Sequence, residues 1–232
     1  MKTIFASILL LAACSSDPLD PGAGSDPGGG TKTLLVEGHA TAEPRFANAK
    51  LATDFETDFS VRISLNNNDV TTGSVMISSR FGMTPLAWNG NDNRWNGRMA
   101  NYDEVYQLDI TSGEDKVAGV IVDGPDIHVF TAPAPGATLD STVQNPLKWN
   151  RDEAAAITTF DSQEVNRVNI DDTGEYMMGV GVLRADRDQA RDDTLELSRT
   201  NHVVPSGAIA GSDFAVTIRN ELDIIVAPNP AL

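Results

Sequence analysis

Phe59-Ser60-Val61-Arg62-Ile63-Ser64-Leu65 is the stretch of sequence that decides the fold. Its apolar and polar residues alternate without a break, and successive side chains of a β-strand point to opposite faces. One face of this strand is therefore buried while the other contacts water, which is typical of an antiparallel sheet. The same alternation occurs at 106–110 and at 214–219.

Shorter strand candidates lie between these segments and are separated by turn-forming residues. Clusters of Asn, Asp, Gly and Pro at 66–69, 112–115, 123–126, 171–174 and 205–207 indicate turns. Many short strands with frequent turns predict an all-β chain of antiparallel β-sandwiches rather than βαβ units. The shorter candidates are 34–41, 73–79, 117–122, 127–130, 147–149, 165–170, 194–199 and 222–226.

The run Thr131-Ala132-Pro133-Ala134-Pro135-Gly136 interrupts the strand pattern near the middle of the chain. A short proline-rich connector is semi-rigid. We therefore predict two tandem sandwich domains, 33–132 and 137–232, joined by the connector 133–136. The alternative is a single domain in which this segment crosses between two sheets.

The N-terminus has a basic start, a short apolar run at 4–11 and then Leu11-Ala12-Ala13-Cys14. The run is too short to span a bilayer, which needs about 20 apolar residues. Leu11-Ala12-Ala13-Cys14 resembles the lipobox of bacterial lipoproteins. This resemblance implies that 1–13 are a signal peptide, that acyl chains such as palmitate are attached at Cys14, and that the chain is held in the cell envelope. An ordinary secretory signal also fits the length but leaves Cys14 without a role.

By the same resemblance, Ser15 directs the lipoprotein to the outer membrane of a Gram-negative cell. The residues that follow are rich in Pro and Gly and have few apolar side chains to bury, so 14–32 is predicted to be a flexible tether. Sandwiches on such a tether resemble the immunoglobulin-like or transthyretin-like domains of bacterial lipoproteins in architecture only. Since Cys14 is the single cysteine, an intrachain disulfide is impossible.

The charge of the chain limits its partners. There are 33 acidic and 17 basic residues, giving a net charge of −16. Nucleic acid requires clustered Lys and Arg, so it is not an expected partner. The expected partners are the membrane, through the lipid on Cys14, and an envelope protein or a glycan.

Catalytic motifs are absent from the sequence. It contains no G-x-S-x-G, H-E-x-x-H, C-x-x-C or glycine-rich phosphate loop. The three histidines, His39, His128 and His202, are far apart, and none has a second histidine at ligand spacing. We therefore expect a protein that is not an enzyme, with no catalytic residue and no cofactor.

One Asp-rich segment could bind a structural calcium ion, because calcium takes oxygen ligands from such loops. The segment 184–193 does not match D-x-[DN]-x-[DN]-G, and three arginines interleave with its aspartates, as in a solvated loop with ion pairs. Both interpretations stay open at this point. The candidate metal ligands are Asp186, Asp188, Asp192 and Asp193.

Two tryptophans flank a predicted hairpin. A turn centred on Asn91-Asp92 would place Trp88 opposite Trp95 on one face, where aromatic pairs stabilise a sheet. Turns at Asn89-Gly90 or Asn96-Gly97 would pair different residues, so the register stays open. If that face is exposed, the two indoles form a platform for stacking a sugar; if it is buried, they belong to the core. Trp149 is interpreted as a core residue of the second sandwich.

These observations predict a lipid-anchored, non-enzymatic envelope protein that binds another envelope protein or acts as a spacer. The alternative is a carbohydrate-binding module that uses Trp88 and Trp95.

Overall fold

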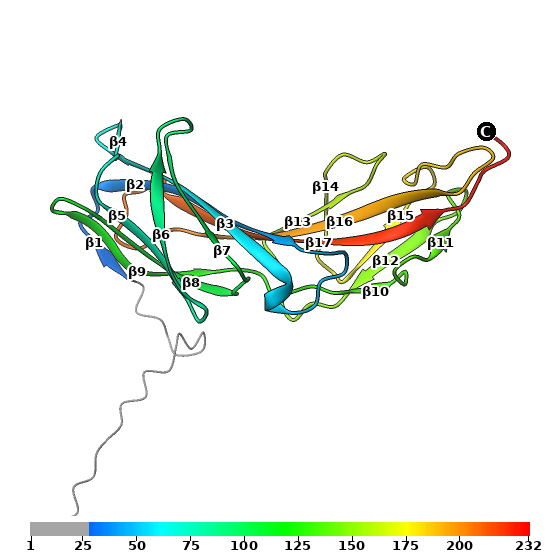
Figure 1. Cartoon of the computed structure of the whole chain (residues 1–232), viewed down its shortest axis with the longest axis horizontal. Coiled ribbons are helices and arrows are strands. Elements are labelled where there is room, and N and C mark those ends of the chain that lie inside the picture. Colours follow the sequence, from blue (N-terminus) through cyan, green and yellow to red (C-terminus); the bar gives the residue numbers. More distant parts are fainter. Residues whose placement is uncertain (1–27) are drawn as a thin grey trace, which may run out of the picture.

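The computed structural model describes residues 28–232, so the predicted signal peptide, Cys14 and tether residues up to 27 lie outside it. The described chain is elongated and consists of two β-sheet lobes side by side (Figure 1). The predicted all-β class and sandwich type are confirmed.

The strands are β1 (Gly29–Gly30), β2 (Leu34–Pro44), β3 (Phe55–Leu65), β4 (Asn68–Asp69), β5 (Ser74–Ser79), β6 (Gly82–Asn89), β7 (Arg94–Met99), β8 (Val105–Ser112), β9 (Asp115–Asp123), β10 (Phe130–Ala132), β11 (Thr138–Leu139), β12 (Asn145–Trp149), β13 (Ile157–Asp161), β14 (Val168–Ile170), β15 (Glu175–Met178), β16 (Arg191–Val203) and β17 (Asp213–Val226), and one 3-10 turn, η1, covers Ala52–Asp54.

The first lobe is a sandwich whose two layers meet along β6. One layer has the order β1-β9-β8-β5-β6, and the other continues from β6 through β7, β3, β2, β17 and β16. Strand β6 serves both layers because its first half pairs with β5 and its second half pairs with β7. The inward side chains of both layers form one apolar core, which includes Phe59, Val61 and Ile63 from the stretch quoted first.

The second lobe is a smaller sandwich with a core of its own. One layer contains β14, β13, β16 and β17, with β11 at its edge, and the other is the three-stranded sheet β10-β12-β15. Side chains from both layers meet in this core, among them Trp149, Phe160 and Leu222. The predicted place of Trp149 in a second core is confirmed.

A long hairpin, formed by β16 and β17, belongs to both lobes. The strands have 13 and 14 residues and pair without interruption from Arg191–Val226 to Val203–Phe214. The N-terminal half of β17 contributes to the first core and its C-terminal half to the second. The sequence patterns at 214–219 and 222–226 are therefore parts of one strand rather than two.

The hairpin also differs from the predicted division of the chain. The last residue of this part of the chain to pack against the first core is Ile127, and the chain enters the second core at Phe130, before the expected connector 133–136. It returns to the first core at 214–218, where β17 pairs in parallel with β2. Residues 33–132 thus lack a strand that completes their own core. The division into two domains stays a prediction.

The end of the glycine-rich segment is part of the fold, in contrast to the predicted tether 14–32. Strand β1 pairs with Val117 and Ala118 of β9, and the backbone N–H of Lys32 donates to the carbonyl of Gly207 (2.8 Å). A Cβ atom at Gly30 would lie 2.5 Å from the carbonyl oxygens of Gly207 and Lys116. Glycine is required here for close backbone packing rather than for flexibility.

Candidate functional site

The inward face of the long hairpin changes from apolar to polar where the two lobes meet. Along β17, Ile218 belongs to the first core and Leu222 to the second, and fully buried Asn220 lies between them. On β16, Leu197 belongs to the second core and is followed two residues later by Arg199, whose side chain is 0% exposed. Buried polar groups need partners, so this position requires a built network.

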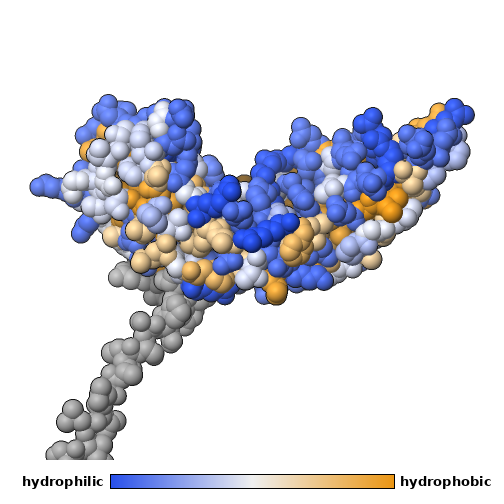
Figure 2. All heavy atoms as spheres, viewed as in Figure 1, coloured by the Kyte–Doolittle hydropathy of each residue, from blue (hydrophilic) through white to orange (hydrophobic). Residues whose placement is uncertain are grey.

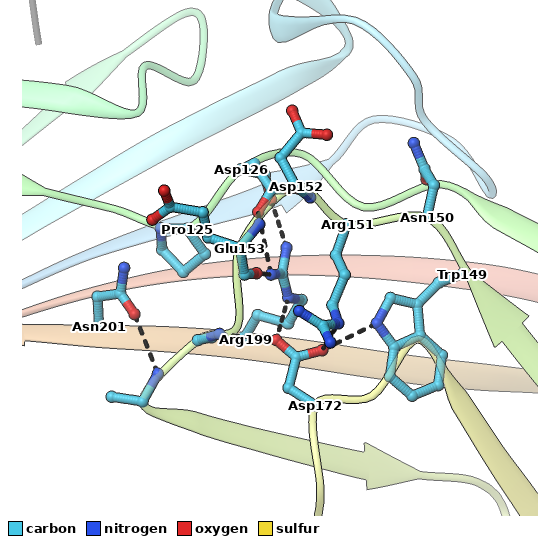
Figure 3. Close-up of polar contacts among 12 residues, drawn as sticks. Pro125, Asp126, Trp149, Asn150, Arg151, Asp152, Glu153, Asp172, Arg199 and Asn201 are labelled. Atoms are coloured by element: carbon cyan, nitrogen blue, oxygen red, sulfur yellow. Dashed lines mark hydrogen bonds and ion pairs between the residues drawn. The ribbon is translucent and has the colours of Figure 1, made fainter. Parts of the chain in front are cut away.

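Arg199 is surrounded by acceptors from the segment between the lobes and from two loops of the second lobe (Figure 3). Its Nε donates to Asp172 Oδ2 (2.9 Å), and its Nη1 donates to the Asp126 carbonyl (2.8 Å). Its Nη2 donates to Asp126 Oδ1 (3.0 Å) and to the Glu153 carbonyl. All three guanidinium nitrogens are therefore engaged. We call Arg199, Asp126, Asp172 and Asn220 the junction.

The two junction carboxylates have further partners. Asp172, 3% exposed, also accepts from Trp149 Nε1 (3.1 Å) and the Ala155 N–H (2.7 Å). Asp126 accepts from the Asp152 N–H (2.9 Å). Burial alone would raise the pKa of Asp126, but the hydrogen bonds and charge of Arg199, with these backbone donors, outweigh burial and hold its pKa below the usual range.

Asn220 connects the hairpin to the segments that pass over it. Its Oδ1 accepts from the Ala49 N–H (3.1 Å), and its Nδ2 donates to the carbonyls of Ala49 and His128 (both 2.8 Å). His128 is fully buried, and its Nε2 lies 3.0 Å from the Leu197 carbonyl. Burial, reinforced by the charge of Arg199, lowers the pKa of His128 to about 3, so this ring is neutral.

An acidic cavity of about 280 Å³ opens beside the junction. Burial first, and neighbouring carboxylates second, raise the pKa values of Glu104 and Asp123. Within residues 28–232, no group of three or more His, Cys, Asp or Glu side chains is arranged to hold a metal ion. The carboxylates of the cavity come from Glu104, Asp123, Asp126, Asp152 and Glu153.

The arrangement connects the lobes rather than presenting reactive groups. Arg199 is fully buried, and each of its three guanidinium nitrogens donates to a protein acceptor, so the side chain is not accessible to a ligand. Its partners come from the segment between the lobes and from loops of the second lobe, which fixes those segments against the shared hairpin. The junction is therefore a buried ionic connection whose chemistry is structural.

Trp88 and Trp95 are cross-strand partners on β6 and β7, as the hairpin reasoning predicted. Their ring centroids are 5.9 Å apart with an interplanar angle of 62°. Trp95 is 5% exposed and donates from Nε1 to the Val70 carbonyl (2.8 Å), whereas Trp88 is half-buried. The pair is thus an edge-to-face contact of the first core, not a flat exposed platform.

The four candidate calcium ligands do not converge in the structure. Asp186 and Asp188 lie in the irregular segment before β16, where the Asp186 carboxylate accepts from the Asp188 N–H (3.1 Å). Asp192 and Asp193 are neighbours on β16 and point to opposite faces. Asp193 faces inward and accepts from the Thr194 N–H (2.8 Å), and burial raises its pKa. Cys14 lies outside the described residues.

The sequence analysis missed the junction because its members had ordinary interpretations. Asp126 and Asp172 were assigned to turns, and Arg199 ended a strand candidate. One signal was available: Phe214, Val216, Ile218, Leu222, Ile224 and Val226 form a regular apolar series with Asn220 in its only gap. A polar residue at an inward position of an otherwise apolar strand face indicates a buried network.

Comparisons with known proteins give only a remote likeness. No protein-family model matches this chain, and no curated protein matches it. A solved structure described as "Crystal structure of DIP-gamma IG1+IG2" is 8% identical, with a TM-score of 0.25, over 85% of this chain and 98% of that one. A likeness at this score carries no argument about function. Among the described residues, no helix has the length and apolar character needed to cross a membrane.

Proposed function

We propose that this protein is a lipid-anchored, non-enzymatic component of the cell envelope that acts as a rigid spacer and presents its second lobe to another envelope molecule. The anchor rests on the lipobox resemblance of Leu11-Ala12-Ala13-Cys14. The observation that carries the spacer role is the hairpin of β16 and β17, which belongs to both lobes.

The hairpin gives the spacer its length and stiffness. Fourteen residues of β17 extend about 45 Å at the rise of an antiparallel strand. A hinge between the lobes would have to bend two paired strands and separate Arg199 from its acceptors. The described chain begins at the first lobe and ends at the far tip of the second, so the two ends of the spacer are well separated (Figure 1).

Anchoring is tested by replacing the acceptor of the lipid. Cys14→Ser is expected to abolish palmitate incorporation and to move the protein from the detergent-soluble membrane fraction to the soluble fraction. Ser16→Ala, two residues away, is the matched control and should leave both unchanged. Palmitate incorporation that persists in Cys14→Ser would contradict the proposal.

Stiffness is tested by a distance measurement across the molecule. Spin labels introduced by Asn67→Cys and Val180→Cys, in the Cys14→Ser chain, report the separation of the two lobes. A rigid spacer should give one narrow distance distribution, which broadens when Arg199→Met is added. A broad distribution before that change would show that the lobes move independently.

A further inference from the structure

Two loops at one end of the first lobe combine exposed apolar side chains with basic ones. In the loop 45–54 and the turn 80–83, a basic residue directly precedes an exposed apolar residue three times: Arg45-Phe46, Lys50-Leu51 and Arg80-Phe81. The exposed fractions are 56% for Phe46, 63% for Leu51, 39% for Phe81 and 73% for Met83. We call these segments the basic-apolar loops.

The basic-apolar loops are neighbours in space, because both contact the segment that leads from β7 to β8. Arg45 Nη2 donates to the Ala100 carbonyl (2.6 Å), and the Tyr102 N–H donates to the Ala52 carbonyl (3.0 Å). From the other side, the Arg80 N–H donates to Asp103 Oδ2 (2.9 Å). Figure 2 shows hydrophobic atoms along this lower side of the first lobe.

The charge at these loops differs from that of the whole chain. Arg45 and Lys50 form no ion pair with a carboxylate in the described part of the chain. Three acidic residues lie close by: exposed Glu104, which feels the charge of Arg80, and Asp54 and Asp103, which are engaged. Asp54 accepts the N–H groups of Lys50 and Leu51, and Asp103 lies 3.4 Å from the Arg80 guanidinium. Three cations thus flank the apolar side chains on a protein of net charge −16.

We infer that the basic-apolar loops dock onto the surface of a bilayer that contains anionic lipid. Apolar side chains at loop tips, flanked by Lys or Arg, are suited to the boundary between acyl chains and phosphate headgroups. This inference rests on the proposed anchor at Cys14 and states how the first lobe lies relative to the membrane.

The number of residues between Cys14 and the described part of the chain also supports docking of these loops on the membrane. Thirteen residues separate Cys14 from Gly28, so even a fully extended chain reaches at most about 50 Å. Strand β1 and the turn between β5 and β6 both lie on the lower side of the first lobe (Figure 1). A lipid on Cys14 therefore holds the loops within reach of the bilayer, at a high effective concentration.

The test uses the full chain coupled through the Cys14 thiol to a maleimide lipid in vesicles of phosphatidylethanolamine and phosphatidylglycerol with brominated acyl chains. Bromine quenches indole fluorescence only at close range. Phe81→Trp, or Met83→Trp if the first variant has a lowered melting temperature, is expected to lose more fluorescence than the unsubstituted chain. Val180→Trp, at the tip of the second lobe and 67% exposed before substitution, is the matched control and should lose no more.

If the loop variant and Val180→Trp are quenched equally, or if neither is quenched more than the unsubstituted chain, the inference is wrong. The loops would then be a candidate surface for a protein partner. Vesicles of phosphatidylcholine alone should abolish the added quenching, and its persistence there refutes the role of the cations. Chemical coupling does not depend on acylation in the cell. Docking of the loops can therefore fail while palmitate labelling of Cys14 succeeds. Docking can also succeed when Cys14 is not labelled in the cell.

Discussion

Replacing Arg199 by methionine should expose how much of the stability depends on the junction. The change leaves the carboxylates of Asp126 and Asp172 without their cation, and the loss of one partner of a buried ion pair costs about 3–5 kcal/mol. Asp172 keeps its bonds from Trp149 and Ala155, and the Arg151 Nε lies 3.7 Å away. We therefore expect the lower end, about 3 kcal/mol, in the free energy of unfolding.

The pH dependence of this loss has a definite sign. In the native chain Asp126 has a lowered pKa, so it contributes stability above its ordinary value of 3.8 that is lost as the pH falls through the folded pKa. Without Arg199, burial dominates and raises the pKa of Asp126, so its ionised form opposes folding at neutral pH. The deficit of the variant should therefore shrink as the pH is lowered into the range where carboxyl groups titrate.

Urea unfolding measures both effects, and Arg219→Met is the matched control. Arg219 lies on the same hairpin and pairs with Glu43 (2.7 Å) but is 29% exposed. Partly exposed pairs contribute about 1 kcal/mol or less. If Arg199→Met costs no more than Arg219→Met, or if its deficit grows on acidification, the junction does not act as described.

Further measurements address other parts of the fold. The pKa of His128 is about 3 in the folded protein and 6.5 ordinarily, so between these values only the unfolded state takes up a proton. The free energy of unfolding should therefore fall by about 1.4 kcal/mol for each pH unit of acidification in this range. Urea unfolding of His128→Phe should lose this slope, and an unchanged slope would show that another group causes it. Gly30→Ala should detach β1 and speed amide exchange of the residues beside it, whereas Gly29→Ala, with nothing within 4 Å of the added carbon, should not. Trp95→Ala should cost about 3–5 kcal/mol in thermal or urea unfolding, and Trp88→Ala clearly less, since only the first indole is fully buried; similar losses would contradict that assignment. The melting temperature should be the same in calcium and in chelator.

The sequence predicts this fold best where burial is one-sided. Phe59 to Leu65 alternates because one face of β3 covers the first core. The pairing of Trp88 with Trp95 matches a turn centred on Asn91-Asp92, one of three turns that the sequence allowed. Strands β13 (Ile157–Asp161) and β15 (Glu175–Met178) escaped prediction because Thr158 is polar but buried, whereas Met177 is apolar but 46% exposed. A polar inward residue or an apolar outward one removes the alternation on which the prediction depends.

Long-range pairing could not be predicted from local pattern. Polar Asn220 made β17 look like two strands, although its amide is satisfied by Ala49 and His128, which are distant in sequence. The same holds for Arg199, whose partners lie 27 to 73 residues away. A local window contains the polar residue but not the groups that make its burial favourable.

The parallel pairing of β17 with β2 sets an order on folding. Val36 N–H donates to Ser212 Oγ across 176 residues, and the first core needs Phe214, Val216 and Ile218 from the end of the chain. Because synthesis proceeds from the N-terminus, β2 has to wait with one edge unpaired until nearly the whole chain has been made. Such an edge can pair with other chains. Both cores need residues of β17, so the first lobe, whose strands are made earliest, waits longest with an open edge.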